Sequence, residues 1–128
     1  MTKKISCDYF GEGETLYFNI MRLAEFEKSI GRPLQRLFIE GFFLDDLFVA
    51  YEIALRHEGR RKPQFYVDKI QELVEKKGLS ISELTTPIQK ALIASGVAGK
   101  QAYYSMFPEE MTEKDEEDLK AEAEAAKN

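Results

Sequence analysis

The side chains in this sequence best suited to chemistry are a single histidine, His57, and a single cysteine, Cys7. Nucleophilic triads and most zinc sites need a histidine arranged with cysteine, serine, aspartate or a second histidine. His57 instead follows Arg56 at the end of an expected helix, where a cation or a hydrogen-bond donor is favourable. We therefore expect His57 to be structural or solvated. Cys7 has no partner for an internal disulfide, which is typical of a reducing compartment.

The carboxylates Asp45, Asp46 and Glu52 are the next candidates, because acidic side chains on helices can bind metal ions. No Asp/Glu-x-x-His motif accompanies them, so we favour a solvated helix face with negative charge near the helix N-terminus. The Gly11-x-Gly13 pair lacks the lysine and the strand-to-helix context of a phosphate-binding loop, and we interpret it as a turn. The sequence thus predicts no enzyme, no bound metal and no cofactor.

Charge is distributed unevenly along the 128 residues. Residues 109–128 carry nine Asp or Glu and three Lys, a net charge of −6, which leaves about +1 of the total −5 on residues 1–108. This pattern predicts a helical domain over residues 1–108 and an acidic, flexible tail over residues 109–128, which is either a solvated helix or disordered. A near-neutral body also argues against general nucleic-acid binding, which needs an excess of Lys and Arg on one face.

The N-terminal segment has two lysines but lacks the apolar stretch of a secretory signal. No run in the sequence approaches the roughly 20 apolar residues that are needed to cross a bilayer. We therefore expect a soluble cytoplasmic protein that does not associate with membranes.

Hydrophobic periodicity predicts a mainly α-helical fold, a compact bundle of about five helices with a short N-terminal β-hairpin. The hairpin is expected within residues 4–19, turning at residues 11–14, and should pack on the helices because an isolated hairpin is marginally stable. Asn19 can cap a helix over 20–30 that ends at Gly31. Pro33 suits the first position of a short helix over 33–40, with Leu34, Leu37 and Phe38 facing inward.

The most apolar helix is expected over residues 42–57. Val49 and Ile53 fall on the side opposite its main apolar stripe. A helix that is apolar on two sides is usually central in a bundle, and we favour that interpretation. The alternative is that Val49 and Ile53 form a partner-binding strip.

The second half of the chain predicts a helix over 64–77 that stops at Gly78. Ser80 and Glu83 have the spacing of a capping box, which predicts a short helical turn over 81–85. Thr86-Pro87 then predicts the start of a further helix that closes at Ser95-Gly96. Residues 97–107 are less regular.

The segment from 103 to 107 is unusually rich in aromatic residues and methionine, which are enriched at the centres of interfaces. These side chains either bind a partner or fold back onto the body as its last core contribution, and the sequence does not favour one over the other. The candidate partner-contact residues are therefore Val49, Ile53, Tyr103, Tyr104, Met106 and Phe107.

Residues 69–84 resemble the opening helices of phage-repressor-type helix-turn-helix domains, in the order helix, Lys-Lys-Gly-Leu-Ser, then Glu-Leu. In those domains a recognition helix follows within a few residues. Here Thr85-Thr86-Pro87 intervenes, and the next helix is poor in the Arg, Asn and Gln side chains that read base edges. A DNA-binding regulator therefore remains an alternative, and it predicts salt-sensitive duplex binding that is lost when Lys76, Lys77 and Lys90 are reversed in charge.

A second resemblance covers roughly residues 16–128. The segments that carry it are Phe18-Asn19-Ile20, Leu23 through Phe26-Glu27 to Gly31-Arg32-Pro33-Leu34, the apolar helix 42–57, the helix 64–77, Leu84 to Gly96 and the charged C-terminus. In this order they are similar to the tail assembly chaperones of long-tailed phages and prophages of Gram-positive bacteria. The chain departs from the usual pattern at Phe26, where Leu before Glu is commoner.

The resemblance implies a mainly helical, non-catalytic protein that acts before the virion is complete. Such proteins bind the tape measure protein, keep it soluble and help tail tube subunits polymerise around it. Self-association would suit a chaperone that coats a long molecule. The third candidate class is an unrelated helical adaptor, which would stay with one stoichiometric partner in the final assembly.

Overall fold

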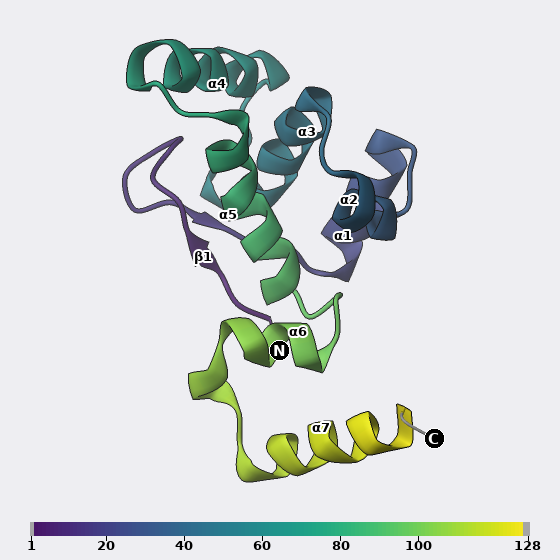
Figure 1. Cartoon of the computed structure of the whole chain (residues 1–128). Coiled ribbons are helices and arrows are strands. Elements are labelled where there is room, and N and C mark those ends of the chain that lie inside the picture. The colour runs from purple at the N-terminus through teal and green to yellow at the C-terminus, as the bar shows by residue number, and fades with distance from the viewer. Residues whose placement is uncertain (1, 127–128) are drawn as a thin grey trace.

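The structure, a computed structural model, describes residues 2–126 and is mainly helical (Figure 1). In chain order its elements are β1 (Ile5–Ser6), β2 (Thr15–Leu16), α1 (Ile20–Ile30), α2 (Leu34–Glu40), α3 (Leu44–Ala54), the 3₁₀-helix η1 (Arg56–Glu58), α4 (Pro63–Lys77), α5 (Ile81–Ala94), α6 (Lys100–Met106), the 3₁₀-helix η2 (Pro108–Glu110) and α7 (Glu113–Ala126). The mainly helical class and the N-terminal hairpin are confirmed. The described residues form seven α-helices rather than about five.

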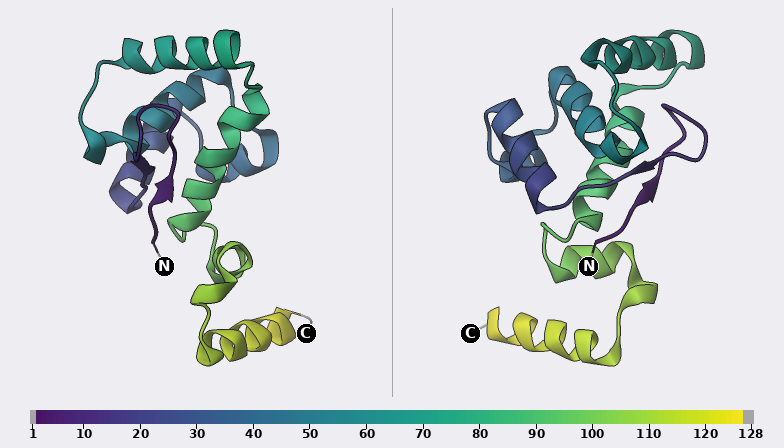
Figure 2. Two further views of the ribbon diagram at one scale, coloured as in Figure 1. Left: turned by 90° about the vertical axis from the view of Figure 1, so that its left-hand side faces the viewer. Right: turned by 180° about the vertical axis from the view of Figure 1, so that it is seen from behind.

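Of the two additional helices, α6 forms where the sequence suggested less regular structure, and α7 forms in the acidic tail, where a solvated helix was one of the two alternatives. Glu113–Ala126 is rich in Ala, Glu and Lys, which have high helix propensity, and Asp115 closes its first turn by accepting a hydrogen bond from the Thr112 N–H at 3.1 Å. Figures 1 and 2 show α7 at the end of the molecule opposite α4. The tail is thus helical, and its flexibility stays a prediction.

The hairpin pairs β1 and β2 antiparallel, with Ile5 opposite Leu16. Each strand has only two paired residues, so the hairpin depends on the helices beneath it. It contacts α3 and α5, and the Tyr17 N–H donates to the Ala54 carbonyl at 3.0 Å. The expected packing of the hairpin on the helices is confirmed.

Local signals set both ends of α1 as the sequence predicted, whereas α2 begins at Leu34, one residue after the predicted first position Pro33. Asn19 Oδ1 accepts a hydrogen bond from the Arg22 N–H at 2.9 Å, and Gly31 ends α1 with φ 71°, a conformation that favours glycine. Pro33 then fixes an extended entry into α2. One expectation for α2 is wrong, because Phe38 is exposed rather than inward.

Helix α3 lies at the centre of the fold, in contact with α1, α4, α5 and β2. Leu47, Tyr51 and Ile53 are all buried. The central-helix interpretation is therefore confirmed. The alternative that placed Ile53 in an exposed strip is wrong, because helices cover α3 on more than one side.

Helix α5 begins at Ile81 and continues through Pro87, so the predicted restart at Thr86-Pro87 is wrong. The capping box is real: the Glu83 N–H donates to Ser80 Oγ at 3.1 Å, and the Ser80 N–H donates to Glu83 Oε1 at 3.3 Å. The capping box and the burial of Leu84 on the inner face both stabilise the helix on the N-terminal side of Pro87.

A proline inside a helix removes one N–H donor and disturbs the carbonyls of the preceding turn. In that turn the Tyr51 hydroxyl of α3 donates to the Leu84 carbonyl at 2.6 Å. The carbonyl that loses its helical donor to Pro87 is that of Glu83, four residues earlier. The Tyr51 hydroxyl therefore adds a second donor to the neighbouring Leu84 carbonyl and joins α3 to α5 in the interior. Sequence spacing alone does not reveal this contact, because its partners are 33 positions apart.

Candidate functional site

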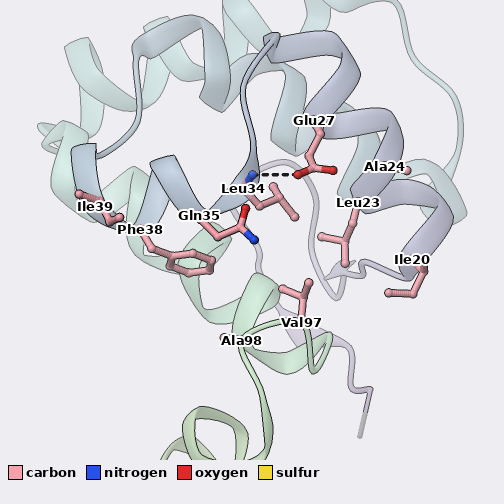
Figure 3. Close-up of a pocket in the computed structure, with 10 residues that line it drawn as sticks. All are labelled: Ile20, Leu23, Ala24, Glu27, Leu34, Gln35, Phe38, Ile39, Val97 and Ala98. Atoms are coloured by element: carbon pink, nitrogen blue, oxygen red, sulfur yellow. Dashed lines mark hydrogen bonds between the residues drawn. The ribbon is translucent and has the colours of Figure 1, made fainter.

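An apolar groove with a volume of about 550 Å³ lies between α1 and α2 (Figure 3). Three elements line it: one face of α1, one face of α2, and the link between α5 and α6. The lining residues are Ile20, Leu23, Ala24, Glu27, Leu34, Gln35, Phe38, Ile39, Val97 and Ala98. We call this feature the α1–α2 groove.

A polar contact joins the two walls of the groove. Glu27 Oε2 of α1 accepts a hydrogen bond from the Leu34 N–H at 2.9 Å, drawn as the dashed line in Figure 3. Leu34 is the first residue of α2, whose N–H has no partner within that helix. Glu27 therefore caps α2 and ties its start to the side of α1.

Large apolar side chains stand at the edges of this groove without cover. Ile39 is 83% exposed, Ile20 is 73% exposed, and Phe38 and Val97 are also exposed. Single exposed apolar residues are ordinary, but a group of them around one hollow is typical of an interaction site. The α1–α2 groove is therefore the best candidate functional site.

The predicted partner-contact residues lie elsewhere. Val49 is half-buried in a smaller groove of about 360 Å³, where Phe48 and Val67 also contribute apolar surface. The placement of Ile53 at a surface is wrong, since only 1% of it is exposed. Val49 lines this groove and one further groove, and none of the aromatic candidates of α6 lines either of them.

The C-terminal candidates fold back onto the body. Tyr103, Tyr104 and Phe107 are buried and Met106 is half-buried, so an exposed binding patch at residues 103–107 is wrong for this conformation. The Tyr103 and Phe107 ring centroids lie 5.1 Å apart. The Tyr103 hydroxyl donates to Glu110 at 2.8 Å, and burial together with this carboxylate raises the pKa of Tyr103 to about 12. The core interpretation of this segment holds.

Sequence reasoning missed the residues that edge the groove. A signal for them was present in the run Leu37-Phe38-Ile39, because three successive apolar residues on a seven-residue helix cannot all face one core. Leu37 faces inward and is buried, which leaves Phe38 and Ile39 outside. Val97 gave no comparable signal, since it lies in a short link.

Two polar clusters lie away from the groove. Asp46 was expected on a solvated face, but it is buried and forms an ion pair with Arg32 at 2.5 Å. It also accepts a hydrogen bond from the Phe43 N–H at 2.7 Å. Asp46 therefore joins the α1–α2 side of the fold to the start of α3, and its charge is already compensated.

His57 sits where the hairpin, α1 and η1 meet. The Arg22 guanidinium donates to His57 Nδ1 at 3.0 Å, and His57 Nε2 lies 2.8 Å from the Thr15 hydroxyl. Because an arginine only donates, Nδ1 must be unprotonated, and in the neutral ring Nε2 carries the hydrogen. Burial and the neighbouring Arg22 charge lower the pKa of His57. This geometry suits a structural histidine, as predicted.

No group of three or more His, Cys, Asp or Glu side chains within residues 2–126 is arranged to hold a metal ion. In the same part of the chain, no helix combines the length and the apolar character that crossing a bilayer requires. Comparisons with protein-family models, with curated proteins and with solved structures found no match.

Proposed function

We propose that this chain is a tail assembly chaperone of a long-tailed phage or prophage, a non-catalytic protein that works in the host cytoplasm. It binds the tape measure protein, keeps it soluble and promotes assembly of the tail tube around it. The observation that carries the proposal is the open α1–α2 groove. The groove is built largely by residues 20–39, which include the segment that carries the resemblance.

The physical requirement on such a chaperone is a surface for apolar helical faces. A tape measure protein is long and helical, and its apolar faces are exposed until the tube encloses them. Helix-in-groove recognition places the apolar face of a helix in a hydrophobic trough. The α1–α2 groove offers such a trough. The acidic tail, with a net charge of −6 over residues 109–128, supports solubility of the complex.

The proposal is tested by co-expressing the chain with the tape measure protein of the same phage or prophage. The tape measure protein should become soluble and co-elute with several copies of this chain, and the chain should be absent from finished tails. An adaptor would persist in finished tails at fixed stoichiometry. A tape measure protein that stays insoluble while this chain elutes alone would contradict the proposal.

A DNA-binding role has one structural feature in its favour, the three-residue link between α4 and α5. The charges oppose it. The exposed first turn of α5 carries Glu83, and Lys90 is the single cation of that helix. Duplex titration at two salt concentrations separates the two functions, since phosphate binding weakens steeply with salt.

A further inference from the structure

We propose that the α1–α2 groove binds two to three turns of a basic amphipathic helix of the tape measure protein. The apolar face of that helix would fill the groove, and a Lys or Arg beside that face would pair with Glu27. This inference rests on the proposed function, because it takes the tape measure protein as the partner.

The shape of the groove matches a helix. On α1 the lining positions are 20, 23, 24 and 27, and on α2 they are 34, 35, 38 and 39, so each wall is one continuous helical face. At 1.5 Å per residue, α1 is about 16 Å long and α2 about 10 Å long. Walls of this length span two to three turns of a third helix.

The chemistry of the groove favours an apolar partner over a small polar ligand. Small-molecule sites place several convergent polar groups within an apolar cavity. Here Leu23 and Leu34 form buried parts of the lining, and exposed Ile20, Phe38 and Val97 stand around them. The groove has polar side chains only at Gln35 and Glu27, and Glu27 already accepts the Leu34 N–H.

Charge selects the kind of helix. Glu27 is the one ionisable side chain that lines the groove, and within residues 2–126 it forms no ion pair. A basic side chain of the partner would supply the missing countercharge.

A second copy of this chain is a poorer occupant. In a two-fold contact, the same surface of both copies meets, so two Glu27 carboxylates would enter one interface. Like charges brought together in an interface oppose binding. The geometry therefore favours a different, basic partner.

The test uses a matched pair of variants in the full chain, Ile20→Glu and Met21→Glu. Both positions lie in the first turn of α1, where a carboxylate is favourable, and both side chains are largely exposed, at 73% and 77%. Ile20 lines the groove and Met21 does not. Both variants should fold with the thermal stability of the wild type, which makes their difference specific to the groove.

Each variant is co-expressed with the full tape measure protein, and co-elution is quantified. We expect Ile20→Glu to reduce the co-eluting tape measure protein at least tenfold, and Met21→Glu to leave it within twofold of the wild type. Glu27→Gln keeps an oxygen that can accept the Leu34 N–H but removes the charge. It should weaken binding roughly three- to tenfold and reduce its dependence on salt.

The outcomes separate this inference from the proposed function. If the wild type and both variants bind the tape measure protein equally, the function stands and the groove assignment is wrong. If none of them binds it, the proposed function and this inference fail together. If Ile20→Glu instead changes the mass of the chain on its own in light scattering, the groove is a self-association surface and the inference is overturned.

Discussion

The hydrogen bond from the Tyr51 hydroxyl to the Leu84 carbonyl makes a prediction that can be worked out from the structure. Tyr51→Phe removes the donor and leaves the shape of the side chain almost unchanged. The carbonyl lies in the turn of α5 that precedes Pro87, and both partners are buried at a distance of 2.6 Å. The Leu84 carbonyl keeps the Ile88 N–H of its own helix, so the variant loses one hydrogen bond, which contributes about 0.5–1.5 kcal/mol. We take about 1 kcal/mol as the expected loss of unfolding free energy.

For a chain of 128 residues, 1 kcal/mol corresponds to about 3–5 °C in Tm, so Tyr51→Phe should lower Tm by about 3–5 °C. The measurement is calorimetry or thermal denaturation followed by circular dichroism. Tyr66→Phe is the matched control, because Tyr66 is also buried but its hydroxyl has no hydrogen-bond partner within residues 2–126. It should change stability by less than about 0.5 kcal/mol.

A double-mutant cycle with Pro87→Ala tests the cause. Alanine restores the missing N–H and removes the ring from the helix interior, so Pro87→Ala alone should stabilise the chain by about 1–3 kcal/mol. In that background Tyr51→Phe should cost the same, because the restored N–H at position 87 faces the Glu83 carbonyl and not the Leu84 carbonyl. Equal losses for Tyr51→Phe and Tyr66→Phe would refute the reasoning, and so would strong coupling in the cycle.

Three further predictions concern the polar groups. Arg32→Met should lower the unfolding free energy by about 3 kcal/mol in urea titrations, because it leaves the buried Asp46 carboxylate unpaired. Arg36→Met, which removes an exposed ion pair, should change the unfolding free energy by less than about 0.5 kcal/mol. Similar losses for the two variants would contradict the assignment of Arg32 and Asp46 as a buried pair. Folding lowers the pKa of His57 below its ordinary value of 6.5. The contribution of the neutral His57 to the unfolding free energy should therefore be fully present above pH 6.5 and should be lost as the pH falls from 6.5 toward the pKa of the folded state. His57→Gln should flatten this part of the pH profile, and an unchanged profile would assign the effect to other groups. Burial raises the pKa of the Cys7 thiol, so a thiol reagent should react slowly with the native chain and rapidly in urea; fast native labelling would show that Cys7 is accessible.

Features coded by neighbouring residues were predictable from the sequence. Asn19, Gly31 and Pro33 each act on the backbone within one turn, so the ends of α1 were placed correctly and the start of α2 to within one residue. The hairpin and the central position of α3 followed from alternation and from apolar density.

Features that depend on distant partners were not predictable. Pro87 normally ends a helix, and the donor beside it comes from Tyr51, far away in the sequence. Periodicity placed Ile53 on a second apolar face of α3, but only packing against neighbouring helices decides that this face is covered. Aromatic residues such as Tyr103 suit a core and an interface equally, so composition could not choose between them.

The candidate site was missed for a related reason. Periodicity shows which residues are apolar on a helix, but not whether another element covers them. Phe38 was expected to face inward together with Leu34 and Leu37, yet α2 is short and nothing within residues 2–126 closes over its outer side. An open groove is thus a property of the assembled fold.

The most direct test of the central claim is aggregation of the purified tape measure protein, followed by light scattering after dilution from denaturant. The account predicts that this chain suppresses scattering in proportion to its concentration until the tape measure protein is saturated. It also predicts that Met21→Glu suppresses scattering as well as the wild type does, whereas Ile20→Glu does not. Scattering that is unchanged at a large excess of the wild-type chain would contradict the claim that this protein is a tape measure chaperone.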